Sequence, residues 1–210
     1  MRIDIKKNKE EFAKLLRSTE RNGVEDMLTD LEKSGFFTAP ASSCHHLNIA
    51  GGLTLHSLNT CKSALIVWEG MKTIEPYMEK EVDRDSIIIA CLLHDICKAD
   101  MYKKTSRKYK TSLGDWEDCE GYKLSFKDFP MGHGEKSLVL ALCSGMELSD
   151  AEMLAIRWHM GPWGVNMNSY EEQKNYDAAK KLYPPVTIVQ IGDGLAANIM
   201  ERTGESLDNL

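Results

Sequence analysis

The chain has 210 residues, of which 42% are hydrophobic and 28% charged, and its formal net charge is −6. This composition supports a sizeable buried core and fits a single domain over residues 1–210. The acidic balance argues against long nucleic acid as a partner, because that affinity comes mostly from neutralising phosphates. A short nucleotide bound by local cations or metals stays compatible with it.

Apolar periodicity and capping signals predict helices along most of the chain. Before residue 100 the predicted helices cover 9–17, 23–35, 49–71 and 84–97, and residues 1–40 form a helical extension ahead of the main domain. The segment IIIACLL within 84–97 is apolar on all sides, which is typical of a buried helix. Few segments have the alternation of a strand, so the predicted fold class is all-α.

Residues 100–130 differ in kind from the helical segments. They lack helical periodicity and have turn signals at Gly114-Asp115 and Gly121, which predicts an irregular or β-hairpin insertion. Helices resume with GEKSLVLALCSG after Pro130 and with AEMLAIRWHM, which Ser149 or Asp150 caps. The last predicted helices are 170–182 and VTIVQIGDGLAANIM, which Pro184-Pro185 opens.

The six cysteines form no C-x-x-C pair, which argues against a thiolate zinc site or a dithiol redox motif. Cys91 and Cys143 lie among apolar residues and are interpreted as small core residues in a reducing compartment. The start MRIDIKKNKEEF has no apolar signal segment, and no stretch is long and apolar enough to span a membrane. We therefore expect a cytoplasmic protein.

Polar side chains on apolar helix faces are the most informative feature of the sequence. Asp193 lies four residues after Val189, and His94, Asp95 and His159 each follow apolar residues by one turn. A buried carboxylate without a partner is too costly to persist. Each group could be a core residue satisfied by a hydrogen bond, but a shared divalent cation would compensate the whole set.

The order His56, His94-Asp95, Asp193 resembles the H…HD…D pattern of the HD superfamily of metal-dependent phosphohydrolases. GGLTLHSLNT around His56 is similar to a segment of bacterial HD-type 3′-to-5′ exoribonucleases, and LLHDICK is similar to their L-L-H-D-I-G-K segment, with Cys97 in place of glycine. GHGEKS and IRWHMG resemble the two further histidine segments of HD proteins that hold two metals, and QIGDGLAA resembles the closing aspartate helix. The resemblance covers about residues 45 to 198 and implies an HD-domain helical bundle.

The resemblance also implies a ligand set for two divalent ions. His56, His94, Asp95 and Asp193 would hold one metal, and Asp95 would bridge to a second held by His133 and His159. Nitrogen and oxygen ligands of this kind suit Mn, Fe, Ni, Co, Zn or Mg. Two such ions activate a water and stabilise the leaving oxygen in displacement at phosphorus.

Further candidates surround this set. Lys98 follows His94 by one turn and would contact a phosphate oxygen or Asp95, so Asp95 and Lys98 are the predicted catalytic residues. The weaker candidates for substrate binding or for support of the ligands, some of which could equally be packing or loop residues, are His45, His46, Arg157, Trp158, Trp163, Glu135 and Lys136.

The expected activity is hydrolysis of a phosphoester in a nucleotide, cyclic nucleotide or short oligonucleotide. Residues 1–40 are too few for the oligonucleotide-binding domain of the nuclease relatives, which favours a small substrate over RNA. The same ligands also fit the mixed-valent di-iron oxygenases of the superfamily, and a metal-stabilised sensing module without turnover is a third possibility. A basic cluster in the insertion either forms a solvated face or attracts the anionic substrate: Lys103, Lys104, Arg107, Lys108 and Lys110.

Overall fold

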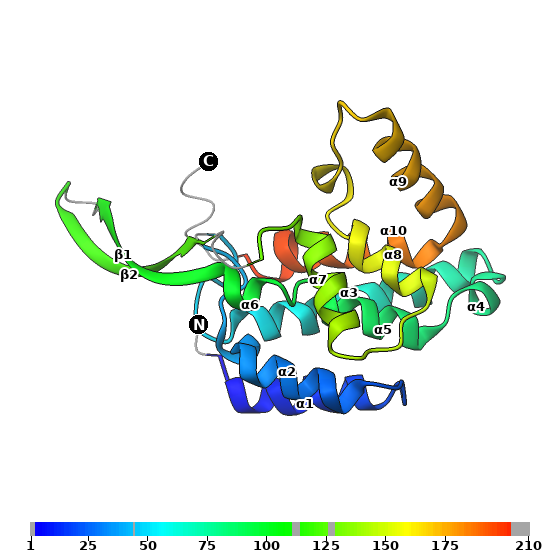
Figure 1. The fold of residues 1–210 in the computed structure, drawn as a ribbon, viewed down its shortest axis with the longest axis horizontal. Coiled ribbons are helices and arrows are strands. Elements are labelled where there is room, and N and C mark those ends of the chain that lie inside the picture. The colour runs from blue at the N-terminus through cyan, green and yellow to red at the C-terminus, as the bar shows by residue number, and fades with distance from the viewer. Residues whose placement is uncertain (1–2, 44, 111–113, 126–128, 203–210) are drawn as a thin grey trace.

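The computed structural model describes residues 3–43, 45–110, 114–125 and 129–202, except for the side chains of residues 107, 109, 110 and 117–120. Within these residues the fold is all-α with one two-stranded sheet, as predicted (Figure 1). The elements are α1 Ile5–Arg17, α2 Val24–Ser34, η1 Phe36–Thr38, α3 Gly52–Ile74, α4 Met78–Glu81, α5 Arg84–Leu93, α6 Lys98–Met101, β1 Tyr102–Lys110, β2 Trp116–Leu124, α7 His133–Cys143, α8 Asp150–Trp158, η2 Gly161–Gly164, α9 Tyr170–Leu182, α10 Pro184–Leu195 and η3 Ala196–Met200.

Helix α5 forms the centre of the core. Every residue from Ser86 to Leu93 is buried, as its continuous apolar sequence predicts, and α3, α8 and α10 pack around it. The Asp83 side chain accepts a hydrogen bond from the Asp85 amide and begins the helix. Helix α10 approaches α3 closely at Gly192, where a Cβ would lie 2.7 Å from the Ala64 methyl group. This contact brings the polar residues of α10 next to those of α3.

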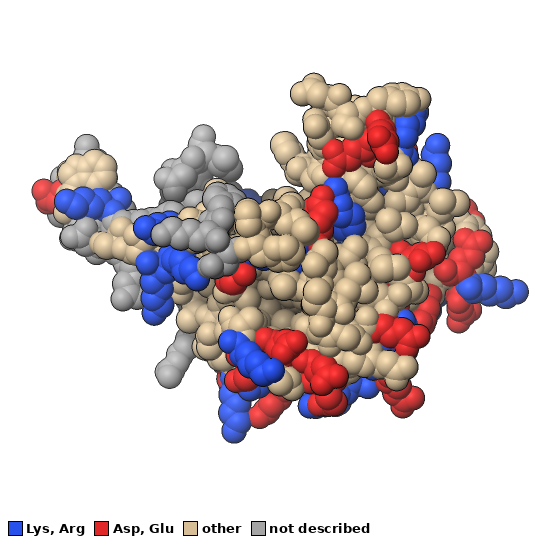
Figure 2. Space-filling view, in the orientation of Figure 1, with Lys and Arg blue, Asp and Glu red and all other residues tan. Residues whose placement is uncertain are grey.

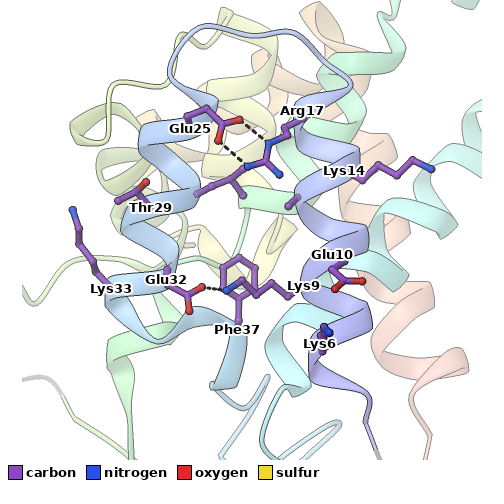
Figure 3. Close-up of a pocket in the computed structure, with 12 residues that line it drawn as sticks. Lys6, Lys9, Glu10, Lys14, Arg17, Glu25, Thr29, Glu32, Lys33 and Phe37 are labelled. Carbon is purple, nitrogen blue, oxygen red and sulfur yellow. Dashed lines mark hydrogen bonds and ion pairs between the residues drawn. The ribbon is translucent and has the colours of Figure 1, made fainter.

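The helices α1 and α2 share the core of the rest of the chain. The rings of Phe12, Phe36 and Phe37 meet at centroid distances of 5.2 to 5.6 Å and belong to the same cluster of buried residues as α5. Ion pairs of Arg17 with Glu25 and of Lys9 with Glu32 join the two helices across a shallow groove (Figure 3). Charged side chains crowd this face of the molecule (Figure 2). The division into one domain and an extension stays a prediction.

The insertion is a β-hairpin. Strands β1 and β2 pair antiparallel from Tyr102 opposite Leu124 to Lys110 opposite Trp116, and the ribbon extends away from the helical body (Figure 1). Gly114, with a φ of 91°, lies between the strands as predicted. The turn predicted at Gly121 is wrong, because Gly121 lies inside β2.

Several predicted boundaries are wrong. The helix predicted over 84–97 ends at Leu93, and the one predicted over 49–71 is Gly52–Ile74. Of the two predicted caps of α8, Ser149 is the one observed, in a capping box with Glu152. Cys91 is buried, but Cys143 is exposed because the end of α7 faces solvent. The short helices α4 and α6 were not predicted.

The predictions about membrane-spanning segments and about the cysteines are tested only in part. Among the helices in the described residues, none is long and apolar enough to cross a lipid bilayer. Cysteines 61, 91, 97 and 143 are free thiols, while Cys44 and the side chain of Cys119 lie outside the described part.

Candidate metal centre

Two helix ends present histidines in the same way. His94 directly follows α5 and His159 directly follows α8, so each is the C-cap of its helix. Each Nδ1 lies 2.7 Å from the carbonyl oxygen three residues earlier, that of Cys91 or Ile156. A carbonyl only accepts, so both Nδ1 atoms carry the proton and both Nε2 atoms keep a lone pair. The lone pairs point to the space between α3, α7, α8 and α10.

His56 reaches the same space from the second turn of α3. Its Nδ1 lies 3.0 Å from the Glu201 carboxylate, while its Nε2 lies 3.1 Å from Asp193 Oδ1 and 3.3 Å from His94 Nε2. Burial disfavours the imidazolium form of His56, but hydrogen bonds to Asp193, Asp95 and Glu201 raise its pKa well above the ordinary value. Acceptor atoms from three elements therefore converge within hydrogen-bonding distance of one another.

Asp95 lies at the centre of the histidines. Its Oδ2 is 3.2 Å from His94 Nε2 and 3.5 Å from His56 Nε2. Its Oδ1 contacts His133 Nε2, at the first residue of α7, and is 3.4 Å from His159 Nε2. One carboxylate oxygen thus faces one pair of histidines and the other oxygen faces the second pair.

Lys98 makes a close ion pair with this carboxylate, with Nζ 2.5 Å from Asp95 Oδ2. Burial disfavours both charges, yet Lys98, His94 and His133 hold the pKa of Asp95 well below its ordinary value. Asp95 in turn raises the pKa of Lys98 against the effect of burial. For His133 burial prevails and lowers the pKa. The centre therefore has an ionised carboxylate beside a neutral imidazole, the forms in which both bind metals.

The donor set fits divalent cations. Four groups have one potential ligand atom per residue within 4.8 Å of one another: His46, His56 and Glu201; His56, His94 and Asp95; His94, His159 and Asp193; and Asp95, His133 and His159. His159 Nε2 is buried and makes no hydrogen bond to any described residue. An orphaned lone pair among acceptor atoms is costly unless a cation occupies the space between them.

The weaker candidates divide into those near the centre and those away from it. The ring of His46 lies 4.9 Å from that of His56, whereas His45 is exposed. Arg157 pairs with Glu135 and Glu172 and lies over the Trp158 ring, and no contact links it to the ligand set.

Lys136 is buried and forms an ion pair with Asp100, 2.9 Å away, rather than with the ligand set. Lys98 was predicted to contact either a phosphate oxygen or Asp95, and in the structure it contacts Asp95.

A cavity of about 380 Å³ opens beside His133. It is lined by Gly132, His133, Gly134, Glu135, Arg157, Met160, Trp163, Gly164, Val165, Asn166 and Glu172. The Trp163 side chain is 90% exposed, although tryptophan usually buries much of its surface. The cavity adjoins His133, which together with His159 faces Asp95 Oδ1, and it has room for a small ligand.

One buried acid at the centre was not predicted from the sequence. Glu201 is 4% exposed and contacts His56, but the last helix was predicted to end at Met200. Its position eight residues after Asp193 gives no helical periodicity signal, because eight residues correspond to about 80° beyond two full turns.

Comparison with known proteins gives one match. A family model described as HD domain matches residues 54–198. No curated protein and no solved structure matches the chain. The matched range begins just before His56 and ends after Asp193, so it includes all six predicted ligands and leaves out Glu201.

Proposed function

The chain belongs to the HD-domain family, and from that membership we propose that it is a metal-dependent phosphohydrolase that cleaves a phosphoester of a nucleotide-like substrate. Most members of this family are metal-dependent hydrolases. The proposed ligands are His56, His94, Asp95 and Asp193 for one ion and Asp95, His133 and His159 for the second. The closer likeness to exoribonuclease-like members stays a prediction.

The position of Asp95 carries this proposal. Its two oxygens face different histidine pairs, with His94 3.2 Å from Oδ2 and His159 3.4 Å from Oδ1. This division would let one carboxylate serve as a ligand to two ions. Such a pair of ions, when bound, supplies Lewis acidity toward water and the phosphate oxygens.

The residues of the chain prepare this chemistry. The bonds from Nδ1 of His94 and His159 to backbone carbonyls fix both rings with Nε2 toward the centre. Fixed ligands need no reorganisation during the reaction. Lys98 holds Asp95 ionised, and its remaining N–H groups are placed to donate to a phosphate oxygen.

The cavity beside His133 is the proposed place for the rest of the substrate. The exposed Trp163 ring offers a surface for stacking, and Asn166 and Glu172 supply polar groups at the wall. Arg157 is already paired with Glu135 and Glu172, so it neutralises the wall instead of capturing phosphate. This arrangement suits an uncharged planar group such as a nucleobase.

Metal content and hydrolysis test the proposal together. Protein reconstituted with Mn²⁺, Ni²⁺ or Fe²⁺ should bind about two ions per chain and hydrolyse phosphoesters in a screen of nucleotides and cyclic nucleotides. His133→Ala should retain about one ion, because His133 belongs only to the group of Asp95, His133 and His159. Absence of bound metal after reconstitution would refute the proposal.

The di-iron oxygenase alternative uses the same donors, so the same samples address it. Iron-loaded protein with a mixed-valent signal in electron paramagnetic resonance, and no phosphoesterase activity with any metal, would favour that chemistry. Metal binding without either hydrolysis or oxygenation would favour the third alternative, a metal-stabilised sensing module.

A further inference from the structure

Glu201 is a buried carboxylate outside the matched family region. It lies after the π-helical turn η3, three residues beyond the end of the family match, and only 4% of its surface is exposed. Its oxygens lie 3.0 and 3.2 Å from His56 Nδ1, and the Asn59 side chain donates to Oε1 at 2.9 Å. His46 Nε2 is 3.8 Å from Oε2. Every polar contact of this acid points toward His56 or its surroundings.

The π-helical turn explains how Glu201 reaches His56. The Glu201 amide donates to the Ala196 carbonyl five residues earlier, at 3.0 Å, which is the π-helical pattern. In a regular α-helix Glu201 would point about 80° away from Asp193, since successive residues turn by about 100°. The additional residue in the π turn brings it to about the position of a seventh residue, about 20° from Asp193. Both acids therefore lie on one face of the helix.

Asp193 and Glu201 contact opposite nitrogens of the same ring. Asp193 Oδ1 is 3.1 Å from His56 Nε2, and Glu201 Oε2 is 3.0 Å from Nδ1. A carboxylate accepts only, so the Glu201 contact holds a proton on Nδ1, and Nε2, which faces Asp193 and the centre, is the nitrogen that would bind the metal. His94 and His159 use backbone carbonyls for the same purpose. His56 lies inside α3, in its second turn, where the neighbouring carbonyls are engaged in helical hydrogen bonds.

We propose that Glu201 is a positioning residue that fixes the tautomer and orientation of His56 for metal binding. The inference rests on the proposed metal centre and adds a residue that acts through His56. A negatively charged acceptor behind a ligating imidazole makes the ring more basic toward the metal than a neutral carbonyl does. Burying a carboxylate is costly, and here the His56 N–H and the Asn59 amide compensate it. The first metal should therefore depend on Glu201.

Metal affinity measured without turnover tests the inference. Glu201→Ala should weaken binding of the more tightly bound Mn²⁺ by roughly 10- to 100-fold, the usual effect of losing such a partner. Glu201→Gln keeps an oxygen that can accept a hydrogen bond from Nδ1 but loses the charge. Its Mn²⁺ affinity should therefore fall less than that of Glu201→Ala. Competition with a fluorescent chelator, with purified metal-free protein, gives the dissociation constants.

Glu152 provides the matched control. It is also a fully buried carboxylate, but it pairs with Arg21 and Ser86 and caps α8. Glu152→Gln should lower the melting temperature of the metal-free protein and leave Mn²⁺ affinity unchanged. If Glu152→Gln and Glu201→Ala reduce affinity equally, the effect of Glu201 is general loss of structure and the inference is wrong.

The histidine tautomer gives a second readout. In ¹⁵N-labelled metal-free protein, His56 should have a protonated Nδ1, and this signal should be lost in Glu201→Ala and retained in Glu201→Gln. Wild-type protein that binds no metal would refute the proposed function itself. Wild-type protein that binds metal, together with unchanged affinity and an unchanged His56 tautomer in Glu201→Ala, would overturn this inference alone.

Discussion

Asp95 has the most demanding environment of any side chain in the centre. It contacts His133 and Lys98, and its two oxygens face separate histidine pairs. Asp95→Asn keeps the shape of the side chain but removes the charge that both proposed ions need. We expect hydrolysis to fall by at least about 1000-fold, or about 4 kcal/mol in transition-state free energy, while helical circular dichroism is retained.

Asp100 supplies the control for this substitution. It lies one turn beyond the HD segment and pairs with Lys136 instead of the histidines. Asp100→Asn should leave the turnover number within a few-fold of wild type. Near-normal activity in Asp95→Asn would show that this carboxylate does not bridge, since an amide cannot replace a shared anionic ligand.

At the scale of elements, local sequence signals predicted most helices but not all of their ends. Ser149 and Glu152 form the capping box that begins α8, and Pro184 begins α10. The end of α5 at Leu93 was not predictable from periodicity, since Ile96 and Cys97 continue the apolar pattern and are buried after the helix has ended. There, tertiary burial rather than helix propensity decides the conformation.

The candidate site was also predicted only in part from local sequence signals. The segments containing His56, His94-Asp95 and Asp193 were identified from sequence, and the structure brings them together. Glu201 could not be identified, because its position depends on one non-α hydrogen bond to Ala196. A regular helical projection places it on the wrong face. The ligand roles themselves stay predictions until metal is measured.

The π turn can be tested as an element, without removing any contacting side chain. Deleting the exposed Asn198 would let η3 relax to a regular α-helix in which Glu201 is the seventh residue after Asp193, still about 20° from it. We therefore expect Mn²⁺ affinity close to that of wild type, and Asn198→Ala, which keeps the residue count, should bind Mn²⁺ equally well. Deleting both Asn198 and the exposed Ile199 would make Glu201 the sixth residue and rotate it by about 100° from His56, so Mn²⁺ affinity should fall as in Glu201→Ala. Equal loss of affinity in the one-residue and two-residue deletions would show that helical position does not place Glu201.

The whole molecule combines a helical body around the centre with one projecting ribbon. Helices α3, α7, α8 and α10 converge with the end of α5, and the ribbon begins directly after α6, which carries Lys98 (Figure 1). Basic side chains lie along the ribbon (Figure 2). Lys103, Lys104 and Lys108 are exposed, while the side chains of Arg107 and Lys110 lie outside the described part.

This arrangement suggests that the ribbon attracts an anionic substrate toward an acidic protein. Attraction by exposed charges is screened by salt, with a Debye length of about 10 Å at 0.1 M. Replacing Lys103, Lys104 and Lys108 together by glutamine should raise the Michaelis constant roughly two- to tenfold at low salt and flatten its salt dependence. The turnover number should change little, because binding common to the ground and transition states is lost.

A triple substitution on α1 separates local from overall charge. Helix α1 carries three exposed lysines far along the chain from the ribbon: Lys6, Lys7 and Lys14. Replacing them by glutamine changes the net charge by the same amount as the ribbon variant. If both triple variants shift the Michaelis constant alike, net charge alone is responsible. If neither shifts it, the ribbon lysines are only a solvated face. A shift confined to the ribbon variant would indicate that the substrate approaches along β1, which begins directly after the helix that carries Lys98, the partner of Asp95.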